Sequence, residues 1–562
     1  MSARDRMFNQ RVRSGIPSTM GTYRADPPQS VIERPVLVAR MDAAIDDPLR
    51  RYGLRLLTQS IGVPVVVHPS ASPDLYYGFD PLIGRTARVW IRPEWEAFTS
   101  RHPPQLTLMN DVPVLHQGDA PLTLVDRNRI EFDMLLASAY WTTLASEQQA
   151  THRDSHRRVP ANASLLGAND LLHRPPLHSY CNLLSRLLWP SGAPSTLLPR
   201  WPNGHKWAAL LTHDVDLPER APISRSLLKE LIRPRSLCRR DAFYALRAEI
   251  MRHGLFECLL AGPTKRREWD FGRLCEQERR SGIRSAYYFA TINRRIGHDC
   301  DVDYDIRLPR YQHLLDSLRD NGFEIGLHAA YSTISNQPNV VDQLNRLTSP
   351  TRQNVRGIRH HYLQLDHDDP MRTLRDHAAA GLTYDSTIGF NDAPGFRAGI
   401  NLPFHPFHSG TAAMNGFIEL PMTLADMHLP HHDTAVAMDS VRSHLECARA
   451  LGGLAVLNWH VGHSQTHPGW RAGYIEACEV LRRDPTVWTP TPTEMADWWI
   501  HRTAELDRAA TDFTTTQVEE VDLMWPGRLR AAAPPFSNEL SAGRVPHSGD
   551  VKIVHNWFME SA

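Results

Sequence analysis

The sequence predicts an α/β protein in which a distorted (β/α) barrel of about seven strands follows a smaller N-terminal α/β domain. Two observations lead to this expectation. After residue 205, short apolar runs alternate with segments of helical periodicity, as in parallel α/β folds. Polar residues follow several of the apolar runs, at the strand ends where barrels place their functional groups. The length of 562 residues is enough for two large domains.

Composition divides the chain into four parts. Residues 1–34 are polar and rich in Arg, Ser and Pro, which is typical of a flexible segment. Residues 35–190 are expected to form the N-terminal domain, and a segment dense in Pro, Gly and Ser separates it from the barrel at 200–500. Residues 501–562 are expected to form a partly flexible C-terminal extension. Within the N-terminal domain we expect strands in 35–42, 62–69 and 87–93 and helices in 132–150 and 177–188.

The barrel strands are expected where apolar runs are bounded by Gly, Pro or polar residues. They are residues 206–216, 285–291, 324–330, 355–362, 383–389, 417–423 and 454–462. Apolar residues recur three and four apart in the segments 308–322 and 436–453, which predicts helices between the strands.

The composition excludes several classes of protein. The 62 Lys and Arg balance the 62 Asp and Glu, and 42% of the residues are hydrophobic, so the chain is not disordered and we expect no nucleic-acid partner. The seven cysteines contain no C-x-x-C pair, which excludes a disulfide framework and a zinc knuckle. Because the sequence has neither a signal-peptide pattern nor a long apolar run, we expect a cytoplasmic protein.

Residues 220–268 form a basic insertion between the first two barrel strands, with twelve Lys and Arg against five Asp and Glu. One interpretation of this composition is a helical insertion whose charged side chains face solvent. Two alternatives are a cradle for an anionic substrate and a peripheral contact with a membrane surface.

The candidate metal-binding and acid–base residues stand at the ends of the predicted strands. Asp214 and Asp216 stand two apart, so both point to one face of a strand, where one can bind a metal while the other acts as a base. His328 ends the third strand, and Arg359 on the fourth can hold a carboxylate ionised. His460 ends the last strand and is a candidate general acid. The 29 histidines of the chain also favour a metal or acid–base site.

These residues resemble the polysaccharide deacetylase family, which is carbohydrate esterase family 4 and NodB-homology-like. The closest resemblance is to a bacterial subfamily with an uncharacterised N-terminal domain. The resemblance implies a TIM-like barrel and a divalent metal, usually zinc. The five motifs of the family match, in order, residues 212–216, 328–332, 357–362, 384–387 and 457–460.

The resemblance implies a role for each matched residue. Asp214 is the base and Arg359 braces it, Asp216 and His328 are metal ligands, and His460 is the general acid. One position departs from the family pattern, because Ser332 replaces the second metal histidine. His361 is then the candidate third ligand, and since His360 and His361 point to opposite faces of a strand, only one of them can face the aspartates. We also expect Asp385 to orient His460, and Tyr362 and Trp459 to bind substrate.

The expected function is therefore a metal-dependent hydrolase that removes an N-acetyl or related acyl group from a sugar in bacterial polysaccharide or glycan-precursor metabolism. Two alternatives stay open. The chain is a catalytically silent glycan-binding or assembly protein if its metal site is degenerate, or a hydrolase of another non-peptide C–N bond. The N-terminal domain shows no readable site, and Asp154, His156 and His178 are interpreted there as surface or interface groups.

Overall fold

The structure is a computed structural model that describes residues 35–524, apart from residues 71, 95–102, 149, 217, 219–270, 293–294, 297–298, 303, 335–336, 352–353 and 463–466. The predictions for the segment 1–34, the insertion 220–268 and the chain after residue 524 lie outside the described residues. No helix among the described residues is long and apolar enough to cross a membrane.

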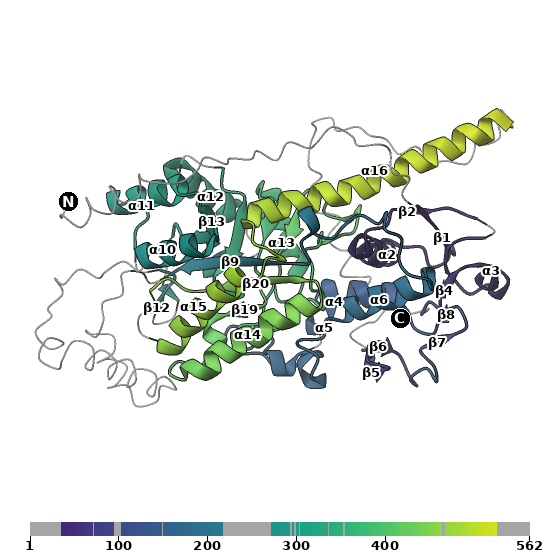
Figure 1. Cartoon of the computed structure of the whole chain (residues 1–562), viewed down its shortest axis with the longest axis horizontal. Helices are drawn as coiled ribbons and strands as arrows, with labels where there is room; N and C mark the ends of the chain where they lie inside the picture. Colours follow the sequence, from purple (N-terminus) through teal and green to yellow (C-terminus); the bar gives the residue numbers. More distant parts are fainter. Residues whose placement is uncertain are drawn as a thin grey trace, which may run out of the picture.

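A curved parallel sheet forms the larger part of the molecule (Figure 1). Its strands run in the order β18-β15-β14-β13-β10-β9-β20-β19, and β21 also pairs with β9. The two outermost strands are consecutive in the chain, β18 (Ile418–Glu419) and β19 (Leu424–Ala425), so the edges of the sheet are brought together in an incomplete barrel. The other members are β9 (Trp207–Val215), β10 (Ala286–Phe289), β13 (Glu324–Ala329), β14 (Gly357–His360), β15 (Tyr384–Asp385), β20 (Leu454–Asn458) and β21 (Val487–Trp488).

The predicted α/β barrel is therefore confirmed, and each of the seven expected strands is present. All pairs in this sheet are parallel, and every residue of β9 is buried, as expected for a strand covered on both faces. The sequence did not separate β19 from β18, nor did it predict β21.

Helices surround the barrel sheet (Figure 1). Helix α15 packs against α14 and α10, and α12 packs against α11 and α13. Several of these helices begin with proline in the first turn, where the missing N–H costs no hydrogen bond. Their bounds are α10 (Phe271–Ser281), α11 (Pro309–Asp320), α12 (Gln337–Thr351), α13 (Pro370–Ala379), α14 (Thr434–Ala450), α15 (Pro468–Arg483) and α16 (Pro492–Met524).

A second sheet lies in the N-terminal part, with the order β2-β1-β3-β4-β8-β7. It is parallel except for the hairpin of β7 and β8. Its strands are β1 (Leu37–Met41), β2 (Val65–Val67), β3 (Leu75–Tyr77), β4 (Val89–Ile91), β7 (Val125–Asp126) and β8 (Arg129–Ile130), beside a separate hairpin of β5 (Gln105–Met109) and β6 (Val112–His116). The three predicted strands are β1, β2 and β4.

The helices of this part are α2 (Pro48–Ile61), α3 (Pro81–Thr86), α4 (Met134–Thr142), α5 (Ala145–Gln148) and α6 (Pro176–Leu188). Helix α2 was not predicted, although its sequence carries clear end signals. The Asp47 side chain accepts the N–H of Arg50, Pro48 occupies the first turn, and Gly62 ends the helix at a φ of 94°. Two further small hairpins are β11 (Arg295–Ile296) with β12 (Asp299–Cys300) and β16 (Phe407–His408) with β17 (Ala412–Ala413).

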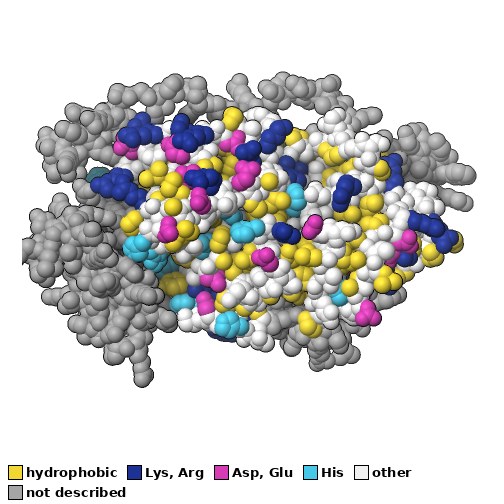
Figure 2. Space-filling model, turned by 60° about the horizontal axis from the view of Figure 1, so that its bottom comes forward, with side chains coloured by type: hydrophobic (Ala, Val, Ile, Leu, Met, Phe, Trp, Pro, Cys, Tyr) yellow, Lys and Arg dark blue, Asp and Glu magenta, His cyan; other side chains and the backbone are white. Residues whose placement is uncertain are grey.

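One hydrophobic cluster runs through both parts of the chain, from Leu37 to Trp499. A buried ion pair also joins them, because Glu147 of α5 accepts two hydrogen bonds of 2.7 Å from Arg397. On the face shown in Figure 2, basic and acidic side chains are intermixed, and histidine side chains reach the surface at several places.

Candidate active site

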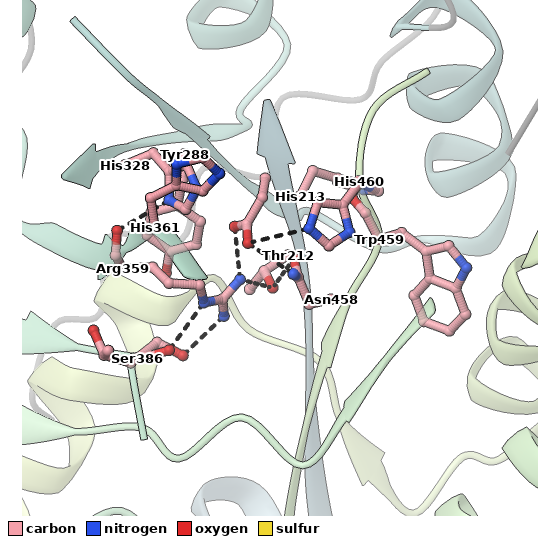
Figure 3. Close-up of polar contacts among 12 residues, drawn as sticks. Thr212, His213, Tyr288, His328, Arg359, His361, Ser386, Asn458, Trp459 and His460 are labelled. Carbon is pink, nitrogen blue, oxygen red and sulfur yellow. Dashed lines mark hydrogen bonds and ion pairs between the residues drawn. The ribbon is translucent and has the colours of Figure 1, made fainter. Parts of the chain in front are cut away.

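The site lies at the carboxyl ends of β14, β13, β9 and β20, four strands of the barrel sheet between whose two pairs β10 runs. Because these strands are parallel, their ends meet at one edge, where barrels carry functional groups. Figure 3 shows the side chains that converge there. The residues contributed by these strands and the turns that follow them are Thr212, Asp214, Asp216, His328, Arg359, His361, Asn458 and His460.

Asp216, His328 and His361 form one cluster, in which one ligand atom from each residue lies within 4.8 Å of the others. Nε2 of His328 is 3.2 Å from Oδ1 of Asp216, and Nε2 of His361 is 3.4 Å from Oδ2. All three residues are buried, and neither Oδ1 of Asp216 nor Nε2 of His328 has a hydrogen-bond partner among the described residues. Two such buried atoms that face each other are costly unless a cation lies between them.

The second nitrogen of each histidine is held by a neighbour, which orients the ring. Nδ1 of His328 lies 3.0 Å from the carbonyl oxygen of Arg359 and therefore carries the proton, leaving the lone pair of Nε2 toward Asp216. Nδ1 of His361 lies 2.9 Å from Oδ1 of Asp301. Burial alone would lower the pKa of His361, but Asp216 and Asp301 raise it to about 9. One carboxylate and two braced imidazoles are a set of ligands that fits a divalent cation.

Asp214 lies beside this cluster and is buried, with 3% of its surface exposed. Arg359 donates a hydrogen bond of 3.0 Å to Oδ1, and Asn458 donates one of 2.8 Å to Oδ2. Burial would raise the pKa of Asp214, but the positive charge of Arg359 and the neighbouring histidines lower it below its usual value. The carboxylate is thus held ionised, which is the state of a proton acceptor.

Arg359 is itself fixed on every side. Its guanidinium donates to Oγ1 of Thr212 at 2.9 Å and to the hydroxyl and carbonyl oxygens of Ser386, each at 2.9 Å. It also lies over the ring of Tyr288, 4.7 Å from the centroid. An arginine so constrained keeps its charge at one place beside Asp214.

His460 faces both aspartates, with Nε2 4.0 Å from Asp214 and 3.8 Å from Asp216. Its Nδ1 lies 2.7 Å from Oδ1 of Asp426, which is fully buried, and its backbone N–H donates to the other oxygen of Asp426 at 2.8 Å. Burial would lower the pKa of His460, but Asp426 and the two other carboxylates raise it to about 10. The imidazole is therefore a proton donor at neutral pH.

The expectation that Asp385 orients His460 is wrong. Asp385 is hydrogen-bonded to Nδ1 of His377 and to the backbone N–H of Thr387. It lies on β15, which β14, β13, β10 and β9 separate from the strand of His460. The carboxylate that orients His460 is instead that of Asp426, which follows β19, the strand paired with β20.

The expectation that Trp459 binds substrate is also wrong. Its indole is 1% exposed and donates to the carbonyl oxygen of Trp470, and Figure 3 shows it directed away from the site. Successive side chains alternate at a strand end, so the side chain before His460 points away from it. Tyr362 is placed beside the metal cluster, with its ring 4.5 Å from that of His361.

Ser332 and His360 do not join the cluster. Ser332 is exposed, and it is not among the three residues whose ligand atoms meet. His360 is buried behind the sheet, where its ring stacks on His377 at 5.5 Å. Of the residues weighed for the third position, His361 is the one that reaches Asp216.

Three residues of the site escaped the sequence analysis: Asp301, Asp426 and Asn458. Asn458 stands within the final matched motif. Asp426 directly follows β19, a strand of two residues, and recognising that strand in the sequence would have identified Asp426 as a residue at a strand end. Asp301 lies in a segment without regular periodicity, and no sequence signal identifies it.

Comparison with known proteins gives structural neighbours alone. No family model and no curated protein matches the sequence. A structure described as a polysaccharide deacetylase from Mycobacterium smegmatis aligns with 54% of this chain and 93% of its own, at 19% identity and a TM-score of 0.34. The structure of an allantoinase aligns with 55% of this chain and 95% of its own, at 15% identity and a TM-score of 0.34. A structure described as a polysaccharide deacetylase from Pseudomonas aeruginosa also aligns with 55% of this chain and 95% of its own, at 14% identity and a TM-score of 0.32.

Proposed function

We propose that the protein is a metal-dependent hydrolase that removes an N-acetyl group from a sugar. The observation that carries the proposal is the pairing of an ionised Asp214 with a protonated His460, 4.0 Å apart, beside the Asp216, His328 and His361 cluster. Carboxyl and imidazole groups whose pKa values are driven apart are the mark of an acid–base pair. The sugar part of the proposal rests on the resemblance of the five sequence motifs.

Asp216, His328 and His361 would hold the metal, for which we propose zinc. When bound, such an ion polarises the amide carbonyl and makes a nearby water more acidic. Asp301 and the carbonyl oxygen of Arg359 keep the two imidazoles turned toward it.

The chain's own residues then move two protons. Asp214 accepts a proton from the attacking water, while Arg359 and Asn458 hold its carboxylate in place. His460 gives its Nε2 proton to the departing nitrogen, and Asp426 stabilises the imidazolium until that transfer. The C–N bond breaks, and acetate and a free amine are formed.

The test measures acetate release from tetra-N-acetylchitotetraose by the zinc-loaded protein. Asp214→Asn and His460→Asn should each lower kcat by about 10²- to 10⁴-fold, since each removes one proton-transfer group. Asp439→Asn is the matched control, because Asp439 is exposed and paired with Arg442 far from the site. Equal rates for wild type and Asp214→Asn would overturn the proposal.

Metal analysis separates the alternatives. Wild-type protein should carry close to one zinc ion per chain, and His361→Ala should lose it. A protein that holds zinc, releases no acetate from the tetramer and hydrolyses a cyclic amide would be a hydrolase of another C–N bond. A protein that binds the tetramer without hydrolysing it would be a glycan-binding module.

A further inference from the structure

A loop of the N-terminal part of the chain reaches the edge of the candidate site. Residues 151–158 follow α5 and turn back at Asp154, whose carboxylate accepts the backbone N–H groups of His156 and Arg158 and the guanidinium of Arg158. The hydrogen bond from its backbone N–H to Asp154 fixes the position of His156 within this turn.

Arg158 and its neighbours fasten this loop to the barrel. Its guanidinium donates to the carbonyl oxygen of Tyr362 and to Asn391, each at 2.7 Å. Gln364 donates to the carbonyl oxygen of His156 at 3.2 Å. Arg158 is buried, so these bonds are shielded from water and hold the loop in one position.

Three partly exposed rings meet where the loop touches the barrel. The ring of His156 lies 4.5 Å from that of Tyr362 and 5.5 Å from that of Tyr331, and the two tyrosine rings are 5.3 Å apart. Nδ1 of His156 is 3.1 Å from the Tyr331 hydroxyl. We call His156, Tyr331 and Tyr362 the aromatic rim.

The aromatic rim is tied directly to the metal cluster. The ring of Tyr362 is 4.5 Å from that of His361, the next residue back in the chain. Oδ1 of Asp301 accepts both the Nδ1 proton of His361 and the backbone N–H of Tyr331, at 2.9 Å each. Any group held at His361 is therefore next to this rim.

We propose that the aromatic rim is a sugar-binding wall of the site. Through His156, the N-terminal part of the chain then contributes directly to substrate binding. This inference rests on the proposed function, because it assigns a position to the ring of the sugar whose amide is cleaved. Aromatic faces pack against the apolar C–H face of a pyranose, and the phenol and imidazole edges hydrogen-bond to its hydroxyls. The place of His156 against Tyr331 and Tyr362 agrees with its interpretation as a surface or interface group, and the proposal adds a role in substrate binding.

The test uses binding in an inactivated background. Tetra-N-acetylchitotetraose is titrated calorimetrically into zinc-loaded Asp214→Asn protein and into the same protein with His156→Ala, which should bind about five- to tenfold more weakly. His156→Phe should restore most of the affinity, because it keeps the ring surface. His152→Ala is the matched control, since His152 is an exposed histidine of the same loop.

Kinetics and a second variant complete the test. In the otherwise wild-type protein, His156→Ala should raise KM for the tetramer with little change in kcat, and Tyr331→Ala should act in the same direction. Unchanged affinity in both variants, or no binding of the tetramer to the Asp214→Asn protein, would overturn the sugar-binding wall. Binding that depends on His156 without acetate release would instead contradict the hydrolase proposal and support the aromatic rim.

Discussion

Nδ1 of His460 lies 2.7 Å from Oδ1 of Asp426, and the other oxygen of the same carboxylate accepts the backbone N–H of His460. The two bonds fix both the position of the residue and the orientation of its ring. They direct Nε2 toward Asp214 and keep the imidazole protonated in a buried place, where it would otherwise be neutral. The same relationship leads to the first prediction.

Asp426→Asn should shift the alkaline limb of the kcat/KM profile toward neutral pH. His460 has a pKa raised to about 10, so its acid form is present at neutral pH and is lost only as the pH rises through that value. Asp426 raises this pKa more than Asp216 or Asp214 does, so removing its charge lowers the pKa of His460 and the acid form is lost at lower pH. The profile of kcat/KM against pH, measured for both proteins on the same substrate, checks this shift.

Asp385→Asn serves as the control for this measurement. It removes a carboxylate that is equally buried and paired with a histidine, but on β15, which four strands separate from the strand of His460. Its alkaline limb should coincide with that of wild type. An alkaline limb that moves for Asp385→Asn but not for Asp426→Asn would contradict the assignment.

Asp301→Asn should weaken metal binding by about 10- to 100-fold while the three ligand residues stay intact. The reason is that Asp301 orients His361 and strengthens it as a ligand through the 2.9 Å contact with Nδ1. Competition between the protein and a chromogenic chelator for zinc measures the loss. Asp305→Asn, in the same segment but exposed and paired with Arg307, should retain wild-type affinity. Equal affinity in the two variants would show that Asp301 does not support the ligand.

Glu147→Gln should lower the free energy of unfolding by about 3–5 kcal/mol, because it leaves the buried Arg397 guanidinium without its counter-charge. Urea denaturation followed by tryptophan fluorescence measures the change. Glu446→Gln removes the partner of Arg449 in an exposed pair and should cost less than about 1 kcal/mol. A loss as small as that of the exposed pair would mean that the two parts of the chain do not depend on this contact.

Much of the fold could be predicted because buried parallel strands leave a strong trace in sequence. The run before Asp214 is apolar at almost every position, and the structure buries all of β9. Strands of two residues leave no such trace, so β19 and β21 escaped, and α2 was missed although Asp47 and Gly62 mark its ends. Local pattern also says nothing about the order of strands in a sheet.

For the site, the sequence by itself determined which residues stand at the ends of apolar strands. Asp214, Asp216, His328, Arg359, His361 and His460 were found in this way, and the structure brings all of them together. Only the tertiary structure decided their partners, because the neighbours of a strand end depend on the strand order and the face to which each side chain points. Asp426 rather than Asp385 supports His460 because β19 borders β20 while β15 lies beyond four intervening strands. His156 reaches the metal side of the site because a loop from the other part of the chain folds against Tyr362, a contact between residues too far apart in sequence for any local pattern to specify.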